Sequence, residues 1–332
     1  MAAEPVHTAL LPAVPPFSLG ASLRALTGFA PCAGDQVVTV EHRPSGPAQA
    51  PARGDRVRKA FPLPTAGLRH DPVAAAEAVV AEVAPRPDGA PGVALTVYAP
   101  RALTGPEAAG VETAVRHWLS LDDDLAPFLA VARRDPALRP ILAATRGLHQ
   151  VRFGSLAEAA VYFTLTQRST QWFAAARKRR VAAELGPRLT VDGVGYVAFP
   201  GFAALAGGDF ERLAGSPARG RRLAEVVAGI GALDEGWLRT APYQDARDAL
   251  LHVRGVGTFT AHAVLLRGLG RPDDIPLEMA QFTGVAQAVY GADDPPGPAE
   301  LRDWYGPYVG WWAYLCRTGL GWLARDPLSA AA

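Results

Sequence analysis

The sequence predicts the α+β fold class, with a small antiparallel-sheet domain first and an all-helical domain after it. Three observations carry this prediction. Apolar runs rich in β-branched residues, typical of strands, occur at Val37–Val40 and Val93–Tyr98. After residue 105 helical periodicity dominates as far as Trp322. A chain of 332 residues is long for one domain, so two domains of ordinary size are expected.

The first domain is expected between residues 15 and 105. Residues 1–14 are rich in alanine and proline and predict a flexible N-terminus, and Arg43–Gly54 has the same bias, which is typical of a loop. The segment Pro72–Val83 has a helical composition and predicts a helix beside the strands.

The helical domain is expected at residues 106–326. It begins at Thr104-Gly105-Pro106-Glu107, which has the N-cap threonine, the early proline and the acidic residue of a helix start. Glycine and proline predict the breaks between helices at Gly147, Gly186-Pro187, Gly207-Gly208, Gly215-Ser216-Pro217 and Gly270-Arg271-Pro272.

Composition narrows the class of function. The 33 basic and 32 acidic residues nearly cancel, so a general DNA-coating protein is disfavoured and nucleic-acid binding would need a local basic patch. Cys32 and Cys316, the only cysteines, make neither a disulfide framework nor a four-cysteine iron–sulfur or zinc site.

The sequence also predicts where in the cell the protein is found. No apolar run approaches the ~20 residues needed to cross a bilayer, and the N-terminus lacks the charged-then-apolar pattern of a secretion signal. We expect a soluble, cytoplasmic protein, associated with the nucleoid if it binds DNA.

A glycine hairpin lies in the helical part, within Leu250–Ala261. The helix-like run Asp245–His252 ends near Gly255 and a second helix begins near Thr258, so Gly255 and Gly257 are expected to supply the unusual backbone angles of a tight turn. Free amides at the start of the second helix would then form a site for an anion, for which a DNA phosphate is the natural candidate.

The hairpin is followed by Pro276-Leu277-Glu278. This pairing resembles the helix-hairpin-helix DNA glycosylase superfamily, in which a Pro-x-Asp element after the hairpin carries the catalytic aspartate. Other matches to the 3-methyladenine glycosylase II branch extend the resemblance over nearly the whole chain, at Leu121–Leu125, Ala126-Pro127-Phe128, Arg146-Gly147-Leu148 and Gln167. The resemblance implies double-stranded DNA with a damaged base as the partner, and no organic cofactor. We expect a monomer.

Glu278 is the candidate catalytic residue. Cleavage of a base from deoxyribose passes through an oxocarbenium-like sugar, whose charge a fixed carboxylate stabilises while it orients or deprotonates water. The alternative is that Glu278 caps or salt-bridges the following helix. Glutamate is one methylene longer than the family's aspartate, which shifts the carboxylate by about 1 Å. Asp274, in the preceding turn, is the second candidate.

The resemblance also implies what Phe259 and the hairpin carbonyls do. Bifunctional members carry a lysine nucleophile at the position of Phe259, so a monofunctional enzyme that leaves an abasic site is expected. The resemblance alone implies a monovalent cation, Na⁺ or K⁺, held by the backbone carbonyls of Val253 and Gly255. His252 and His262 flank the hairpin without partners at metal-ligand spacing.

Several residues are candidate DNA contacts. Gln167 and Arg168 match the segment that fills the hole left by a flipped base, and Arg168 could stack on the orphan base or be an ordinary surface arginine. The cluster that begins at Arg219 follows a helix start at Ser216-Pro217 and is favoured for phosphate contact, with Gly257, Thr258 and Phe259 of the hairpin. The cluster Arg177–Arg180 is better interpreted as a solvated helix face.

Aromatic side chains would line a pocket for a cationic alkylated base, because cation–π attraction favours the positive leaving group. The chain is rich in aromatic residues between Trp304 and Trp322, most of which are expected in the core. Tyr308 matches a family pocket position, and Trp172 and Phe163 are candidates for the opposite wall.

The sequence therefore predicts a monofunctional DNA glycosylase that releases alkylated purines such as 3-methyladenine or 7-methylguanine. Two alternatives stay open: a glycosylase for deaminated or oxidised bases, and a non-catalytic DNA-binding protein that keeps the hairpin and pocket. Geometry separates the last one. A Glu278 carboxylate that faces an aromatic cleft beside Arg168 favours the enzyme, whereas one paired with a surface arginine favours the binding protein.

Overall fold

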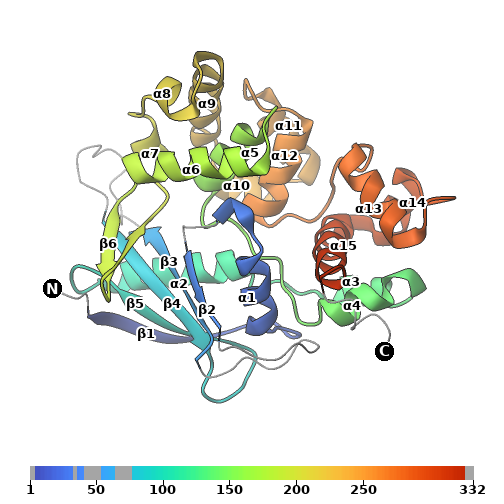
Figure 1. Cartoon of the computed structure of the whole chain (residues 1–332), viewed down its shortest axis with the longest axis horizontal. Coiled ribbons are helices and arrows are strands. Elements are labelled where there is room, and N and C mark those ends of the chain that lie inside the picture. The colour runs from blue at the N-terminus through green and yellow to red at the C-terminus, as the bar shows by residue number, and fades with distance from the viewer. Residues whose placement is uncertain (1–3, 33–35, 41–53, 64–76, 326–332) are drawn as a thin grey trace.

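The computed structural model describes residues 4–32, 36–40, 54–63 and 77–325. It is a mixed α/β structure with a five-stranded antiparallel sheet in the order β1-β5-β4-β3-β2 and helices around it (Figure 1). The strands are β1 (Pro5–Pro12), β2 (Gln36–Thr39), β3 (Arg56–Pro62), β4 (Ala78–Pro85) and β5 (Gly92–Tyr98). The predicted α+β class and the strand predictions at 37–40 and 93–98 are confirmed, within one residue at each end.

Two expectations for the first hundred residues are wrong. Pro5–Pro12, expected to be loose, forms β1 and pairs with β5 from Pro5 opposite Tyr98 to Pro12 opposite Gly92, with one register shift between Pro5 and His7. Its prolines are tolerated because β1 is an edge strand. The predicted helix Pro72–Val83 is a strand from Ala78 onward, because its valines are buried between β3 and β5. Residues 72–76 and 43–53 lie outside the described residues.

Helices account for most of the rest of the chain. They are α1 (Leu19–Thr27), α2 (Gly105–Leu119), α3 (Ala126–Ala132), α4 (Arg139–Ala144), α5 (Leu156–Thr166), α6 (Gln171–Leu185), α7 (Phe202–Leu205), α8 (Phe210–Ala214), α9 (Pro217–Gly231), α10 (Glu235–Thr240), α11 (Tyr243–His252), α12 (Thr258–Val264), α13 (Ala280–Tyr290), α14 (Pro298–Tyr305) and α15 (Val309–Leu323). One turn of π-helix, η3 (Leu265–Leu269), continues α12. None of the described helices is long and apolar enough to span a bilayer.

The start of the helical part follows its sequence signal. The Thr104 hydroxyl accepts from the Glu107 amide, and the Glu107 carboxylate accepts from the Thr104 amide at 2.8 Å, which completes a capping box at the N-terminus of α2. The predicted helix start is therefore confirmed.

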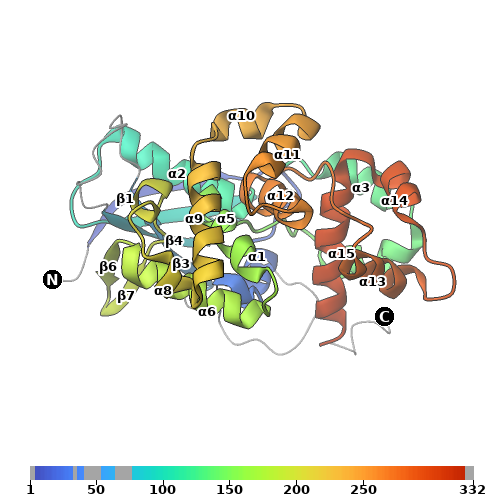
Figure 2. The same cartoon turned by 90° about the horizontal axis from the view of Figure 1, so that it is seen from above.

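A β-hairpin interrupts the helices, which the sequence did not predict. Strands β6 (Arg188–Val191) and β7 (Val194–Val197) meet at Asp192-Gly193, both at positive φ, as a two-residue hairpin turn requires. Val191 and Tyr196 pack with residues of the five-stranded sheet in a small apolar cluster. Figure 2 shows this hairpin at the opposite end of the molecule from α13–α15.

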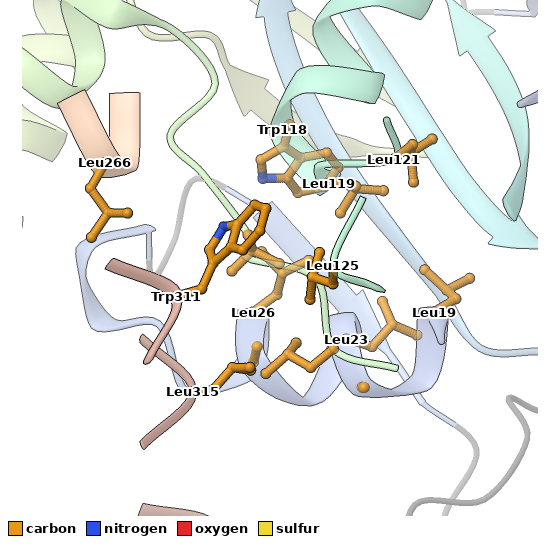
Figure 3. Close-up of a cluster of buried hydrophobic side chains, with 14 of the residues drawn as sticks. Leu19, Leu23, Leu26, Trp118, Leu119, Leu121, Leu125, Leu266, Trp311 and Leu315 are labelled. Atoms are coloured by element: carbon orange, nitrogen blue, oxygen red, sulfur yellow. The ribbon is translucent and has the colours of Figure 1, made fainter. Parts of the chain in front are cut away.

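Two hydrophobic cores hold the molecule together. The first joins the sheet and α1 to α2, α3, α4 and α15, so apolar packing continues across residue 105. Figure 3 shows the leucines of α1 beside Trp118–Leu125, with Trp311 and Leu315 of α15 on the other side. The second core surrounds α5, which is buried from Leu156 to Leu165, and includes α6, α9, α11 and α12.

A buried ionic cluster connects the sheet to the second core. Glu158 on α5 lies 2.6 Å from Lys178 Nζ on α6 and 3.6 Å from Lys59 Nζ on β3, and all three side chains are almost fully buried. Burial alone would raise the pKa of Glu158, but attraction by the two lysines and hydrogen bonds from Lys178 and the Gly154 amide lower it well below the ordinary glutamate value. Glu158 is therefore ionised in the folded protein.

We predict that Glu158→Gln lowers the free energy of unfolding by about 3–5 kcal/mol, because the two lysines lose their buried counter-charge. Urea denaturation measures the change. Glu211→Gln is the matched control: Glu211 lies 3.6 Å from Arg221 and both side chains are largely exposed, so it should lose less than ~1 kcal/mol.

The buried cluster around Glu158 also makes the free energy of unfolding depend on pH. Because the folded-state pKa of Glu158 is lowered, its stabilisation is complete above the unfolded value of about 4.3 and is lost as the pH falls through the lowered folded value. Equal losses in Glu158→Gln and Glu211→Gln at neutral pH would contradict this account.

Candidate functional site

A cavity of about 620 Å³ lies between α5, α12, the turn before α13, and α15. Aromatic side chains make much of its wall, among them Phe29, Phe153, Phe163, Phe259, Phe282 and Tyr314. Ile275 and Pro276 close one side, and Gln167 reaches it from the end of α5. The cavity is apolar with a few polar groups, as sites for small planar molecules usually are.

The glycine hairpin forms as predicted, but its two glycines differ. The Val256 amide donates to the Val253 carbonyl at 3.0 Å, and Gly255 adopts φ +91°, which only glycine enters without strain. Gly257 has an extended backbone with φ −103°, so the expectation that it supplies an unusual angle is wrong. Nothing lies within 4 Å of the position that a Cβ on Gly257 would take, which leaves its backbone open on that side.

Gln167 ties the end of α5 to the hairpin. Its side-chain amide nitrogen donates to the Gly255 carbonyl at 2.9 Å and to Thr260 Oγ1 at 3.2 Å. Because the amide is engaged in these bonds, Gln167 fixes how the hairpin lies relative to the turn after α5.

The hairpin carbonyls for which the resemblance implies a monovalent cation each accept one hydrogen bond, and the cation stays a prediction. The Gly255 carbonyl accepts from Gln167 and the Val253 carbonyl accepts from the Val256 amide, and each oxygen keeps a second lone pair. Among the described residues, no group of three histidine, cysteine or acidic side chains could hold a metal ion.

Glu278 lies in the turn before α13, between Pro276 and Gln281, which both line the cavity. Its carboxylate is 61% exposed and accepts from Arg302 on α14, at 2.7 Å for Oε1 and 3.3 Å for Oε2. Arg302 also donates to Asp274 Oδ1 at 3.0 Å and to the Ile275 carbonyl at 3.1 Å. One guanidinium therefore holds both candidate carboxylates and the backbone between them.

This pairing sets the charge of Glu278. The hydrogen bond from Arg302 lowers the pKa of Glu278 below its ordinary value, so the carboxylate is ionised at neutral pH. The partner is a half-exposed arginine, which is the geometry that the sequence analysis associated with the non-catalytic alternative. The open side of the carboxylate still faces solvent beside the cavity wall.

The turn after α5 presents Arg168 to solvent. Arg168 is exposed and adopts φ +50°, which is uncommon for a residue other than glycine. The Arg168 carbonyl accepts from Arg219 Nη2 at 3.4 Å, and the hydroxyl of Ser169 accepts from Arg177 Nη1 at 2.9 Å. Arg219 follows the N-cap Ser216 of α9, so the predicted helix start there is confirmed.

The predicted pocket aromatics lie in different places. Phe163 lines the cavity and contacts Phe259, with ring centroids 6.0 Å apart. Trp172 is 68% exposed and packs edge-on against Phe173 beside the Arg168 turn. Tyr308 stacks on Trp311, with ring centroids 5.6 Å apart, against the first core. The structure brings only Phe163 of the three to the cavity among the described residues.

The structure places Lys178 and His262 in buried surroundings that the sequence did not predict. Lys178, expected on a solvated helix face, is buried against Glu158, so that interpretation is wrong for this residue. His262 lines the cavity and is buried; its Nδ1 lies 2.8 Å from the Tyr243 hydroxyl and 3.3 Å from the Asp274 carbonyl. Burial lowers the pKa of His262, so its ring is neutral at neutral pH.

Sequence reasoning missed the cavity residues Arg267 and Phe29, and it did not single out Tyr314 among the late aromatic residues. The Arg267 guanidinium carbon lies 4.5 Å from the ring centroid of Phe29 and 5.1 Å from that of Tyr314, and its Nη2 donates to the Val151 carbonyl at 2.9 Å. These residues come from three distant parts of the chain and belong to no motif, so no sequence signal could have grouped them.

The chain is similar to known proteins along most of its length. It is 26% identical over 206 residues to the DNA-3-methyladenine glycosylase of Bacillus subtilis, a match that covers 60% of this chain and 68% of the relative. It is 33% identical over 166 residues to a Mycobacterium tuberculosis protein described as a probable bifunctional transcriptional activator/DNA repair enzyme AlkA. That match covers 48% of this chain and a third of the relative (33%).

Among solved structures, the fold is similar to that of a 3-methyladenine DNA-glycosylase from Archaeoglobus fulgidus. The TM-score is 0.69 at 16% identity, over 94% of this chain and 98% of the other. No family model matches the chain.

The hairpin gives a matched pair of substitutions. We predict that Gly255→Ala lowers the free energy of unfolding by about 1–3 kcal/mol, because alanine is strained at φ +91° and its Cβ would lie 2.9 Å from Arg222 Cγ. Gly257→Ala should change stability by less than ~0.5 kcal/mol, since its backbone is ordinary and its surroundings open. Urea denaturation of both variants tests this, and equal losses would overturn the assignment of the strained turn to Gly255.

Proposed function

Because the chain belongs to the helix-hairpin-helix DNA glycosylase superfamily, in its 3-methyladenine glycosylase II-like branch, we propose that it is a monofunctional DNA glycosylase. It would hydrolyse the N-glycosidic bond of alkylated purines that are flipped out of duplex DNA, with water as the nucleophile and no organic cofactor. The similarity to a DNA-3-methyladenine glycosylase and to an AlkA protein supports the class of substrate.

One arrangement carries the proposal: an aromatic cavity bounded by the hairpin helix α12 and by the Pro276 turn, with Glu278 beside it. A cavity of this size accommodates a flipped base, which would stack on Phe163 and Phe259. The deoxyribose would stay at the mouth, because the backbone of the duplex cannot enter.

Glu278 would act at that mouth. As the bond to the base breaks, the sugar gains positive charge, and an ionised carboxylate near C1′ stabilises it and orients the attacking water. The hydrogen bond from Arg302 keeps Glu278 ionised and fixes one side of its carboxylate. The exposed side is left for the sugar and water. Asp274 lies on the far side of the same guanidinium, where it would position Arg302.

Three elements would hold the DNA. The amides at the start of α12, from Gly257 to Phe259, would bind a phosphate, and Arg219 would bind another near the start of α9. Arg168, at the tip of the turn after α5, would fill the hole left by the flipped base. Gln167 would act through its bonds to the hairpin, by fixing the distance between wedge and phosphate site.

The chain's lysines support a monofunctional reaction. The sequence contains two lysines, Lys59 and Lys178, and both are buried against Glu158. Phe259 stands where bifunctional members carry their nucleophile, and its ring faces the cavity. Neither lysine amine is placed to form a Schiff base with an abasic sugar.

A non-catalytic lesion-binding protein is the second candidate. The observation that favours it is the ion pair between Glu278 and Arg302, which would be a structural contact if the sugar never approached the carboxylate. The same DNA contacts would serve either function, so only catalysis separates them.

We predict that Glu278→Gln slows base release from duplex DNA by about 10²-fold or more under single-turnover conditions, because the neutral amide cannot stabilise the sugar's charge. Affinity for the same duplex should stay within a few-fold. Since the pKa of Glu278 is lowered, the wild-type rate should lose its carboxylate-dependent part only when the pH falls below the ordinary glutamate range.

Two variants control this experiment. Asp303→Asn removes an exposed carboxylate next to Arg302 and should leave the rate unchanged. Glu278→Asp restores the family's residue and should keep most of the activity. Wild-type rates in Glu278→Gln would eliminate the catalytic role, whereas lesion-selective binding without release by the wild type would establish the non-catalytic candidate.

Borohydride trapping tests the absence of a Schiff base. We predict no covalent adduct between the wild-type protein and DNA that contains an abasic site, because both lysines are buried in the Glu158 cluster. Phe259→Lys is the positive test, since it places an amine at the cavity wall. A trapped wild-type adduct whose peptide map leads to Lys59 or Lys178 would contradict the proposal.

A further inference from the structure

The lining of the cavity carries positive charge, and the Glu278 carboxylate lies beside the lining and not in it. Three arginines line it, Arg267, Arg317 and Arg325, and among the described residues no aspartate or glutamate does. Arg317 and Arg325 are exposed, whereas Arg267 lies deeper in the wall. A cationic base that entered would therefore meet like charge from these three arginines, which disfavours its binding beside them.

Arg267 also occupies the aromatic faces. It lies on the π-helical turn η3, and its guanidinium is held over the rings of Phe29 and Tyr314. These are the electron-rich surfaces that would otherwise attract a cationic base by cation–π interaction. Because the Arg267 guanidinium already makes these cation–π contacts, the faces of Phe29 and Tyr314 are not free to attract a cationic base.

The guanidinium of Arg267 has a buried hydrogen-bond donor that no acceptor in the described part of the chain satisfies. Its Nη2 donates to the Val151 carbonyl, whereas its buried Nε has no hydrogen-bond partner within residues 4–32, 36–40, 54–63 and 77–325. A buried donor without an acceptor is unfavourable, so an acceptor that reaches the guanidinium gains affinity. A guanidinium also donates to the carbonyl oxygen on the edge of a base, as arginine does to O6 of guanine.

We propose that Arg267 makes the cavity selective for damaged bases that carry a carbonyl oxygen, such as hypoxanthine and 7-methylguanine, over 3-methyladenine, which carries none. This inference rests on the proposed glycosylase activity and names Arg267 as its specificity-determining residue. Neutral hypoxanthine gains the hydrogen bond without repulsion from the arginines, so it is the preferred base of the three.

Competition within one substrate tests the proposal. Duplex DNA treated with a methylating agent contains both 7-methylguanine and 3-methyladenine, and mass spectrometry of the released bases gives both single-turnover rate constants from the same reaction. We expect Arg267→Met to lower the ratio of 7-methylguanine to 3-methyladenine release roughly 10- to 100-fold. Hypoxanthine release from a defined duplex should fall by a similar factor.

The ratio is insensitive to the fraction of protein that folds, because both bases compete for the same active molecules. Arg267→Gln provides a second variant, which keeps a neutral donor near Val151. Arg212→Gln, an exposed arginine on α8, is the matched control and should leave the ratio unchanged. A ratio unchanged in both Arg267 variants overturns the selectivity while leaving the glycosylase intact.

Binding separates failure of the inference from failure of the proposed function. In a Glu278→Gln background, which needs no catalysis, Arg267→Met should lower the preference for a hypoxanthine duplex over an unmodified adenine duplex by about tenfold. If the wild type releases no base but this preference depends on Arg267, the proposed enzyme fails and the recognition stands. An equal preference with and without Arg267 refutes the recognition.

Discussion

The position of α5 is the constraint on which the rest of the structure depends, and Glu158 sets it. This helix starts at the N-cap Ser155, and in its first turn Glu158 binds Lys59 of the sheet and Lys178 of α6. A buried charge tolerates only the geometry that pairs it, so the two lysines fix α5 in both rotation and position. Phe163 of the cavity wall and Gln167 at the hairpin lie farther along the same helix.

From that anchored helix the site is assembled by backbone contacts more than by side-chain chemistry. Gln167 binds the Gly255 carbonyl and so joins the Arg168 turn to the hairpin. Arg302 performs the same task on the other side, since it binds the Ile275 carbonyl as well as two carboxylates. The cavity therefore lies between two turns, each held in place by amide or guanidinium contacts.

The sequence predicted the features that depend on local rules. The capping box at Thr104, the positive φ of Gly255 and the strands around Val38 and Leu95 follow from residue type and spacing alone. The failures have a common cause in tertiary context. The valines of β4 form a strand because β3 and β5 flank them, and Pro5–Pro12 forms one because β5 offers an edge.

The candidate site divides in the same way. Glu278 could be singled out from the Pro276 turn, but its pairing with Arg302 on α14 could not, because the two are 24 positions apart and share no pattern. Arg267 follows the hairpin in the sequence, but its place in the cavity wall could be recognised only from its contacts with Phe29 and Tyr314. The sequence shows which residues are charged, but it does not show which distant residues they contact, and those contacts determine their role.

The burial of both lysines has a consequence beyond the reaction. Every side chain that carries a permanent positive charge at the surface is an arginine, since the chain's two ammonium groups are enclosed with Glu158. Guanidinium groups are not acetylated and react poorly with amine-directed reagents. The surface that would meet DNA is thus closed to regulation by lysine acetylation, and an amine-reactive dye would leave the side chains of the folded protein unlabelled.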